Sequence, residues 1–362
     1  MSAVSIVVLC FSVLGAIDYL LGNKMGLAQE FQKAFSIFMP MALSMLGMIV
    51  IAPAIGVWLT PAFDGFYNLF GIDPSVLPAS VFANDMGGAS LAQSICKTTE
   101  MGNYNAFVVA SMMGCVISFT IPFSIGIVKQ EQHKELFLGI LCGMVTIPLG
   151  CFVAGLILKL HAGALLLNLL PLIIFAVLIG AALLLFPKAC IKCFTVFGYA
   201  MKILGVVGLM CAIFTFLTKI EINPNFDTLE SAAFVCVNAC VTLSGALPLM
   251  MIVSKLLKKP LNKLGALLGI NAISTLALLG TIVTNASTFG VMDQMDKKGV
   301  VLNAAFAVSA SFALGSHLAY TMAFDGAYAL PMIVGKLISG VCALLLAVLI
   351  GREKAAAAEP IA

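Results

Sequence analysis

Apolar runs of about 20 residues recur along the whole chain, and short polar stretches separate them. A run of this length suits an α-helix that crosses the hydrocarbon core of a bilayer. The pattern predicts nine spanning helices over the ranges Ala3–Leu21, Phe35–Thr60, Tyr104–Val128, Leu136–Leu160, Ala164–Phe186, Phe194–Leu217, Ser231–Leu256, Val300–Phe324 and Tyr328–Ile350. No stretch between them is long enough for a separate soluble domain. We therefore predict an all-α polytopic membrane protein with one transmembrane domain.

Two further apolar runs, Ser75–Cys96 and Leu264–Phe289, are interrupted by polar residues. The first contains Asn84-Asp85 followed by Gly87-Gly88, and the second contains Thr284-Asn285. An Asp near the middle of a membrane costs about 3 kcal/mol on insertion scales, and each glycine weakens a helix by roughly 1 kcal/mol relative to alanine. We therefore expect both runs to be re-entrant or broken helical segments, with Gly87 and Gly88 at the break of the first.

The two interrupted runs belong to a wider internal similarity. Matches between the two parts of the chain occur at offsets of 192 to 200 residues, and they pair Gly71-Ile72-Asp73 with Gly269-Ile270-Asn271, Asn84-Asp85 with Thr284-Asn285, Asn105 with Asn303 and Gly143 with Gly335. Such an offset predicts two repeats, a common plan in secondary transporters. We expect repeat one near residues 1–160, a linking helix near 164–186, repeat two near 194–350 and a short cytoplasmic tail at 351–362.

Charge distribution bears on the topology of the interrupted runs. If both cross the membrane, Lys and Arg outside the helices divide 9 to 8 between the two sides. If both enter and return on one side, the division is 14 to 3, with Lys97, Lys159 and Lys219 on the poorer side. The positive-inside rule favours the second arrangement. It places the N-terminus outside and the C-terminus in the cytoplasm, inverts the repeats, and lets the polar tips meet near the midplane. If the first interrupted run instead crosses the membrane as a broken helix, a further short crossing at Pro61–Ile72 would leave the later loops on the same sides of the membrane.

Composition narrows the function classes. The chain is 62% hydrophobic and 10% charged, whereas soluble domains carry about 25% charged residues. The sequence contains no HExxH, GxSxG or glycine-rich phosphate motif, so we expect no enzyme, no cofactor and no metal site. Basic residues follow the predicted cytoplasmic loops, so we expect the lipid bilayer and no nucleic acid among the partners. Other copies of the same chain, in a homo-oligomer, are a further possible partner.

The polar residues of the interrupted runs are the first candidates for a binding site. The Asp85 carboxylate can pair with an ammonium group through charge-assisted hydrogen bonds. We favour a functional role because ionisable residues inside membrane segments usually mark functional sites. Alternatively, Asp85 ties the segment together or pairs with Lys336. Asn285 offers a neutral donor and acceptor that suits a hydroxyl. Asn84 and Thr284 serve the same site or cap the adjoining helices.

Three residues of the later helices complete the set of candidates. Lys336 lies deep in a predicted helix. It is either the counter-ion of Asp85 or one partner of a salt bridge that opens when the substrate binds. His317 is a proton relay or a histidine hydrogen-bonded inside the bundle. Asn303 lies on the same predicted helix as His317, and we include it among the candidate substrate-binding residues.

The sequence resembles the ethanolamine-utilization permease family, EutH, over nearly its whole length. The stretches that carry the resemblance are Ala83–Gly88, Cys142–Cys151, Met292–Asp296, Asn303–Ala310 and Pro331–Ile338. The resemblance implies a bacterial inner-membrane protein that brings ethanolamine into the cell. Members of the family carry an acid where this chain has Ser316, so a role given to that acid does not carry over.

The implied substrate fits the candidate residues. Ethanolamine is mostly protonated at neutral pH, so Asp85 is expected to hold its ammonium group while Asn285 or Asn84 holds its hydroxyl. One alternative is an ion-coupled carrier of another small polar substrate, such as an amino acid or a nucleoside. Another is a membrane sensor or assembly protein without transport. The repeats and the polar tips favour a carrier.

Overall fold

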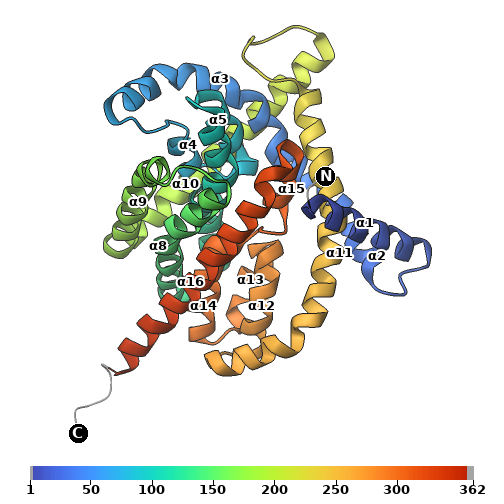
Figure 1. Cartoon of the computed structure of the whole chain (residues 1–362), viewed down its shortest axis with the longest axis vertical. Helices are drawn as coiled ribbons and strands as arrows, with labels where there is room; N and C mark the ends of the chain where they lie inside the picture. The colour runs from blue at the N-terminus through green and yellow to red at the C-terminus, as the bar shows by residue number, and fades with distance from the viewer. Residues whose placement is uncertain (1–2, 357–362) are drawn as a thin grey trace.

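The computed structural model describes residues 3–356, and helices joined by loops make up all of that part of the chain (Figure 1). The helices up to the first loop after α8 are α1 Ala3–Leu20, α2 Leu27–Ser36, α3 Phe38–Phe70, α4 Val76–Val81, η1 Asn84–Met86, α5 Gly88–Ile95, α6 Thr99–Tyr104, η2 Asn105–Gly114, η3 Val116–Thr120, α7 Ile121–Ile127, η4 Gln130–Gln132 and α8 His133–Ile157. Those that follow are α9 Ala162–Leu185, α10 Pro187–Thr218, α11 Leu229–Leu268, α12 Ala272–Val283, α13 Asn285–Phe289, η5 Met292–Gln294, α14 Lys297–Ala310, α15 Ser316–Phe324, η6 Gly326–Tyr328 and α16 Ala329–Ala356. The predicted all-α class is therefore confirmed.

Seven helices of the described residues are long and apolar enough to cross a membrane. They are Met45–Phe70, Thr99–Ile127, Gln130–Ile157, Ala162–Leu185, Pro187–Thr218, Leu229–Leu257 and Gly326–Ile350. Each overlaps one of the nine predicted spans. An eighth span results if Lys259–Leu268 and Ala272–Val283, which meet at 120°, are counted as one.

The other two predicted spans differ from expectation. Ala3–Leu21 corresponds to the shorter apolar helix α1. Val300–Phe324 was predicted as one helix, but it is divided into α14 and α15 by five residues, 311–315. Phe312 adopts a left-handed conformation (φ 61°) there, which few residues other than glycine adopt readily. The apolar pattern is continuous across this break, so periodicity does not reveal it.

The first interrupted run folds as a hairpin, which we call the first hairpin (residues 73–97). Its limbs are α4 and α5, and η1 forms the tip between them. The Asp73 carboxylate accepts hydrogen bonds from the backbone N–H groups of Lys97 (3.0 Å) and Thr98 (3.3 Å), so the two ends of the segment meet. At the tip Gly87 has a φ of 87°. A Cβ on Gly88 would lie 2.2 Å from the Phe82 carbonyl oxygen, so only glycine fits there.

The second interrupted run closes in a similar way and is called the second hairpin (residues 271–296). Its limbs are α12 and, on the return, α13 with η5. Here the acid is at the end of the segment: Asp296 accepts hydrogen bonds from the Asn271 backbone N–H (2.9 Å) and the Ser274 hydroxyl (3.0 Å). The prediction of two broken helical segments is therefore confirmed. α4 and α5 lie in the upper part of Figure 1, and α12 and α13 lie in the lower part.

Small residues allow the long helices to pack closely where they cross. A Cβ on Gly47 of α3 would lie 1.8 Å from the Gly205 carbonyl oxygen of α10, and one on Gly150 of α8 would lie 2.4 Å from the Gly335 carbonyl oxygen of α16. Membrane helices associate through such contacts because lipid supplies no hydrophobic driving force between them. This packing fixes the frame around the hairpins.

Candidate functional site

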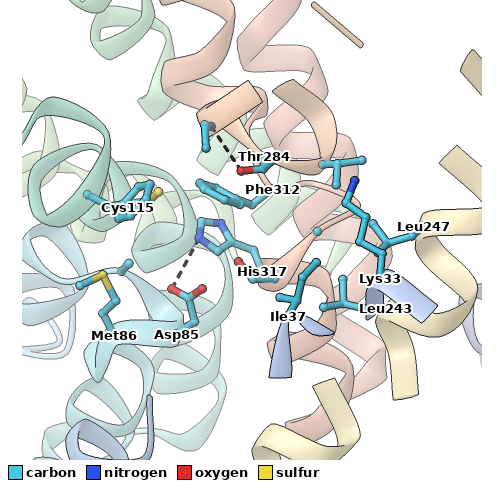
Figure 2. A pocket seen from close by; sticks show the side chains of 16 residues that line it. Lys33, Ile37, Asp85, Met86, Cys115, Leu243, Leu247, Thr284, Phe312 and His317 are labelled. Atoms are coloured by element: carbon cyan, nitrogen blue, oxygen red, sulfur yellow. Dashed lines mark hydrogen bonds and ion pairs between the residues drawn. The ribbon is translucent and has the colours of Figure 1, made fainter. Parts of the chain in front are cut away.

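A cavity of about 510 Å³ lies where the two hairpin tips approach each other. The first hairpin supplies Asp85 and Met86, and the second supplies Thr284. The break between α14 and α15 supplies Phe312, and α15 supplies His317. Figure 2 shows Asp85 and Thr284 on opposite sides of His317 and Phe312. Residues that are distant in sequence thus meet in one site.

Among the residues that the structure describes, Asp85 is the one acidic residue that lines this cavity. Its side chain is 16% exposed, and its Oδ1 lies 3.7 Å from Nε2 of His317, which is 1% exposed. The hydroxyl of Ser316 also interacts with this carboxylate. The His317 ring packs at a tilt of 38° against that of Phe312, with the ring centroids 4.9 Å apart. The carboxylate is therefore accessible on one side and held by α15 on the other.

The tip of the second hairpin is built from its own short-range hydrogen bonds. The Thr284 hydroxyl accepts a hydrogen bond from the backbone N–H of Ala286 (3.3 Å), so Thr284 caps α13 while it lines the cavity. Asn285 is fully buried and donates its side-chain amide to the Thr120 hydroxyl (3.1 Å). Its Oδ1 has no hydrogen-bond partner within the part of the chain that the structure describes.

The break between α14 and α15 pairs with the backbone of the second hairpin. Phe312 N–H donates to the Thr281 carbonyl oxygen (3.3 Å), and Leu314 N–H donates to that of Ile282 (2.9 Å). A Cβ on Gly315 would lie 2.0 Å from the Val283 carbonyl oxygen. The second hairpin and the start of α15 are therefore held together, and this places His317 beside the cavity.

Asn84 is the least satisfied polar side chain near Asp85. It is fully buried, and neither its Nδ2 nor its Oδ1 has a hydrogen-bond partner among residues 3–356. It does not cap η1, which begins after Ala83. Buried amides are normally hydrogen-bonded, so Asn84 has an unused NH2 group and an unused carbonyl oxygen directly before Asp85 in the chain.

Four candidates do not line the cavity: Asn84 and Asn285, which are buried next to lining residues, and Asn303 and Lys336. Asn303 is fully buried and donates to the carbonyl oxygens of Ser274 (2.8 Å) and Gly299 (3.0 Å), which ties α14 to the start of the second hairpin. Lys336 is also fully buried, and its ammonium group donates to the Ser111 carbonyl oxygen of η2. Lys336 forms no ion pair within 4.0 Å in the described chain, whereas Asp85 pairs with His317.

Sequence reasoning missed most of the apolar wall. The missed lining residues include Phe119 and Phe312, whose rings meet edge to face at 5.7 Å, and Cys115 beside them. Leu243 of α11 and Lys33 of α2 complete the opposite wall. These residues lie in ordinary apolar or amphipathic stretches, so no local signal distinguished them from lipid-facing or surface positions.

Comparison with known proteins gives one consistent result. The sequence model of the family described as "Ethanolamine utilisation protein, EutH" matches residues 2–350. The chain is 37% identical to the Listeria monocytogenes protein named "Probable ethanolamine permease EutH", over 92% of this chain and 90% of the relative. It is 33% identical to the Salmonella typhimurium protein of the same name, over 95% and 94% of the two chains. No solved structure matches at a significant level.

Proposed function

Because this chain belongs to the EutH family, we propose that it imports ethanolamine across the bacterial inner membrane, with the substrate bound between the two hairpin tips. The names of its relatives support ethanolamine as the substrate. The observation that carries the site is Asp85, the single carboxylate that the described part of the chain places on the cavity wall. A protonated amine binds a carboxylate through charge-assisted hydrogen bonds, which are stronger than neutral ones.

The remaining groups of the substrate have partners nearby. Phe119 and Phe312 give the ammonium group an aromatic wall, which attracts cations. The hydroxyl pairs with Asn84, whose amide has neither of its polar atoms hydrogen-bonded in the described chain and directly precedes Asp85, rather than with Asn285, where only the amide oxygen is unpaired. Because Asn84 is fully buried behind the cavity wall, its side chain turns toward the cavity when the substrate binds. The cavity exceeds the volume of ethanolamine, so water accompanies the substrate in this state.

We further propose that the two hairpins belong to inverted repeats. Two buried asparagines 198 residues apart support this: Asn105 donates to the Ser75 hydroxyl (2.8 Å), and Asn303 donates to the Ser274 carbonyl oxygen (2.8 Å). Each thus binds the start of the preceding hairpin. With the charge distribution, this puts the N-terminus outside and the C-terminus in the cytoplasm. A C-terminal reporter that works only in the cytoplasm is expected to be active; an inactive one, with the protein inserted, contradicts this topology.

Uptake of labelled ethanolamine into vesicles that contain the purified protein tests the function. The native chain is expected to raise uptake over empty vesicles, and unlabelled ethanolamine is expected to compete better than an amino acid or a nucleoside. Asp85→Asn is expected to abolish nearly all uptake. Asp293→Asn is the matched control, because Asp293 pairs with Lys129 on the surface. Retained uptake in Asp85→Asn with unchanged apparent affinity removes Asp85 from the substrate site.

A further inference from the structure

We infer that Lys336 is the resident counter-charge of the Asp85 site and that it excludes inorganic cations such as Na⁺ and K⁺ from the site. This inference rests on the proposed function, because it concerns selectivity between the substrate ammonium and smaller cations. The charge of Lys336 weakens the binding of every monovalent cation alike, so inorganic ions, which lack the further contacts of the substrate, stay too weakly bound to occupy the site. The argument begins with the surroundings of the Lys336 ammonium group.

The Lys336 ammonium is buried without a directly paired acid. It donates to the Ser111 carbonyl oxygen, and no acidic oxygen of the described residues lies within 4.0 Å. The groups that interact with it electrostatically are the Cys115 and Cys151 thiols and the Asp85 carboxylate. A buried ammonium costs several kcal/mol unless other charge compensates it. The Asp85 carboxylate is the one full negative charge among these neighbours.

A short chain of contacts connects the two charges. Ser111, whose carbonyl accepts the Lys336 hydrogen bond, lies four residues before Cys115, and Cys115 lines the cavity together with Asp85. His317 in turn lies 3.7 Å from Asp85. Lys336 of α16 is thus fixed about one helical turn from a residue of the cavity wall, and the same cavity is lined by Asp85 of η1 and His317 of α15.

Other polar groups around the cavity do not replace Lys336 in this role. Lys33 of α2 also lines the cavity, but its side chain is 56% exposed and pairs with Glu30 at 3.6 Å. The Tyr320 hydroxyl of α15 pairs with the Ser90 hydroxyl of α5 at 3.3 Å. Solvent screens the exposed lysine, whereas the buried one acts at low dielectric.

The balance of charge determines which cations gain from entering. With Lys336 present, the carboxylate and the ammonium sum to zero, so a bare ion gains little from Asp85 and loses its water in a largely apolar cavity. Ethanolamine adds hydrogen bonds and contacts with Phe119 and Phe312 that a simple ion lacks. At an effective dielectric of about 20, two unit charges about 10 Å apart change each other's binding on the order of tenfold, and removal of the Lys336 charge is expected to strengthen cation binding on this scale.

The test measures initial ethanolamine uptake into vesicles against substrate concentration, with either NaCl or isosmotic sucrose outside. Lys336→Met is expected to lower the KM for ethanolamine on the order of tenfold, to slow turnover because release is slower, and to make uptake sensitive to Na⁺. Lys336→Arg is expected to keep the native KM and to remain insensitive to Na⁺. Lys202→Met is the matched control, because Lys202 is exposed on α10.

A purely structural role for Lys336 predicts a different result. Uptake would then fall in Lys336→Met with KM unchanged or raised and without Na⁺ sensitivity, and this overturns the inference. If Lys336→Met fails to fold, the double variant Asp85→Asn/Lys336→Met decides: recovery of the folded protein in detergent supports the charge balance, and failure to recover contradicts it. If the native chain takes up no ethanolamine, the proposed function is contradicted rather than this inference. The comparison of folding between Lys336→Met and Asp85→Asn/Lys336→Met then still tests the charge balance.

Discussion

The closure of the first hairpin depends on a single carboxylate, and Asp73→Ala removes it. Asp73 is 8% exposed and uses both oxygens. Oδ1 accepts from the backbone N–H (3.0 Å) and the hydroxyl (2.5 Å) of Ser75, at the start of the first limb. Oδ2 accepts from the backbone N–H groups of Lys97 (3.0 Å) and Thr98 (3.3 Å), at the end of the second limb. Alanine leaves all of these donors without the carboxylate.

The expected loss follows from the two hydrogen bonds that join the limbs. A hydrogen bond to a charged group contributes about 1.5–3 kcal/mol, and water replaces part of it because Lys97 and Thr98 are exposed. The free energy of unfolding is therefore expected to fall by about 3 kcal/mol. Asp64→Ala is the control: Asp64 pairs with Lys97, but its side chain is 44% exposed, and exposed ion pairs contribute about 0–1 kcal/mol.

Thermal unfolding in detergent can be followed with a thiol-reactive dye, because Cys115, Cys151 and Cys236 are buried and become reactive only when the protein opens. Asp73→Ala is expected to lower the midpoint by several degrees relative to the native chain, and Asp64→Ala is expected to leave it nearly unchanged. Equal midpoints for the two variants refute the view that Asp73 closes the hairpin.

Two further predictions concern the second hairpin and the first tip. Burial raises the pKa of Asp296, but the hydrogen bonds that its carboxylate accepts, first that from the Asn271 backbone, outweigh burial and hold the pKa below its usual value. The ionised carboxylate therefore stabilises the folded protein fully above about pH 4, and this stabilisation is lost as the pH falls through the lowered pKa. Unfolding midpoints measured from neutral to acidic pH are expected to fall less steeply in Asp296→Asn, and parallel curves argue against the assignment. Gly88→Ala is expected to destabilise the protein by about 2 kcal/mol, because its Cβ would lie 2.2 Å from the Phe82 carbonyl oxygen. Gly126→Ala, which meets no atom within 4 Å, is expected to have no such effect, and equal stability of the two variants contradicts the packing argument.

The hairpins could be predicted because their sequence conflicts with a simple spanning helix. An acid and two adjacent glycines inside an apolar run are unfavourable in a continuous membrane helix, and the fold places them at a tip. The shared Gly-Ile-Asp and Gly-Ile-Asn starts also indicated a common layout. The acids that close the hairpins were not identified, because Asp73 and Asp296 occupy opposite ends of their segments.

The break between α14 and α15 could not be read from the sequence for a different reason. Residues 311–315 contain no proline and only one glycine, and the hydrophobic pattern continues through them. The break is stabilised by backbone hydrogen bonds to Thr281 and Ile282, which are about 30 positions earlier in the chain. A local pattern carries no information about such a partner. Lys336 was recognised as unusual, but its actual partner is a backbone carbonyl, which a sequence does not single out.

The backbone contacts of the two hairpins place Asp85 and His317 on two separately packed groups of elements. The first hairpin carries Asp85 and packs on η2, where a Cβ on Gly114 would lie 2.1 Å from the Phe82 carbonyl oxygen. The second hairpin holds the start of α15, which carries His317. The pair therefore joins two groups of elements that are each fixed by their own backbone contacts. In the proposed site, an ammonium group that binds the carboxylate competes with His317 for it, so substrate binding is expected to weaken the contact between the first hairpin and α15. Coupling between binding and movement requires such a difference in contacts between states.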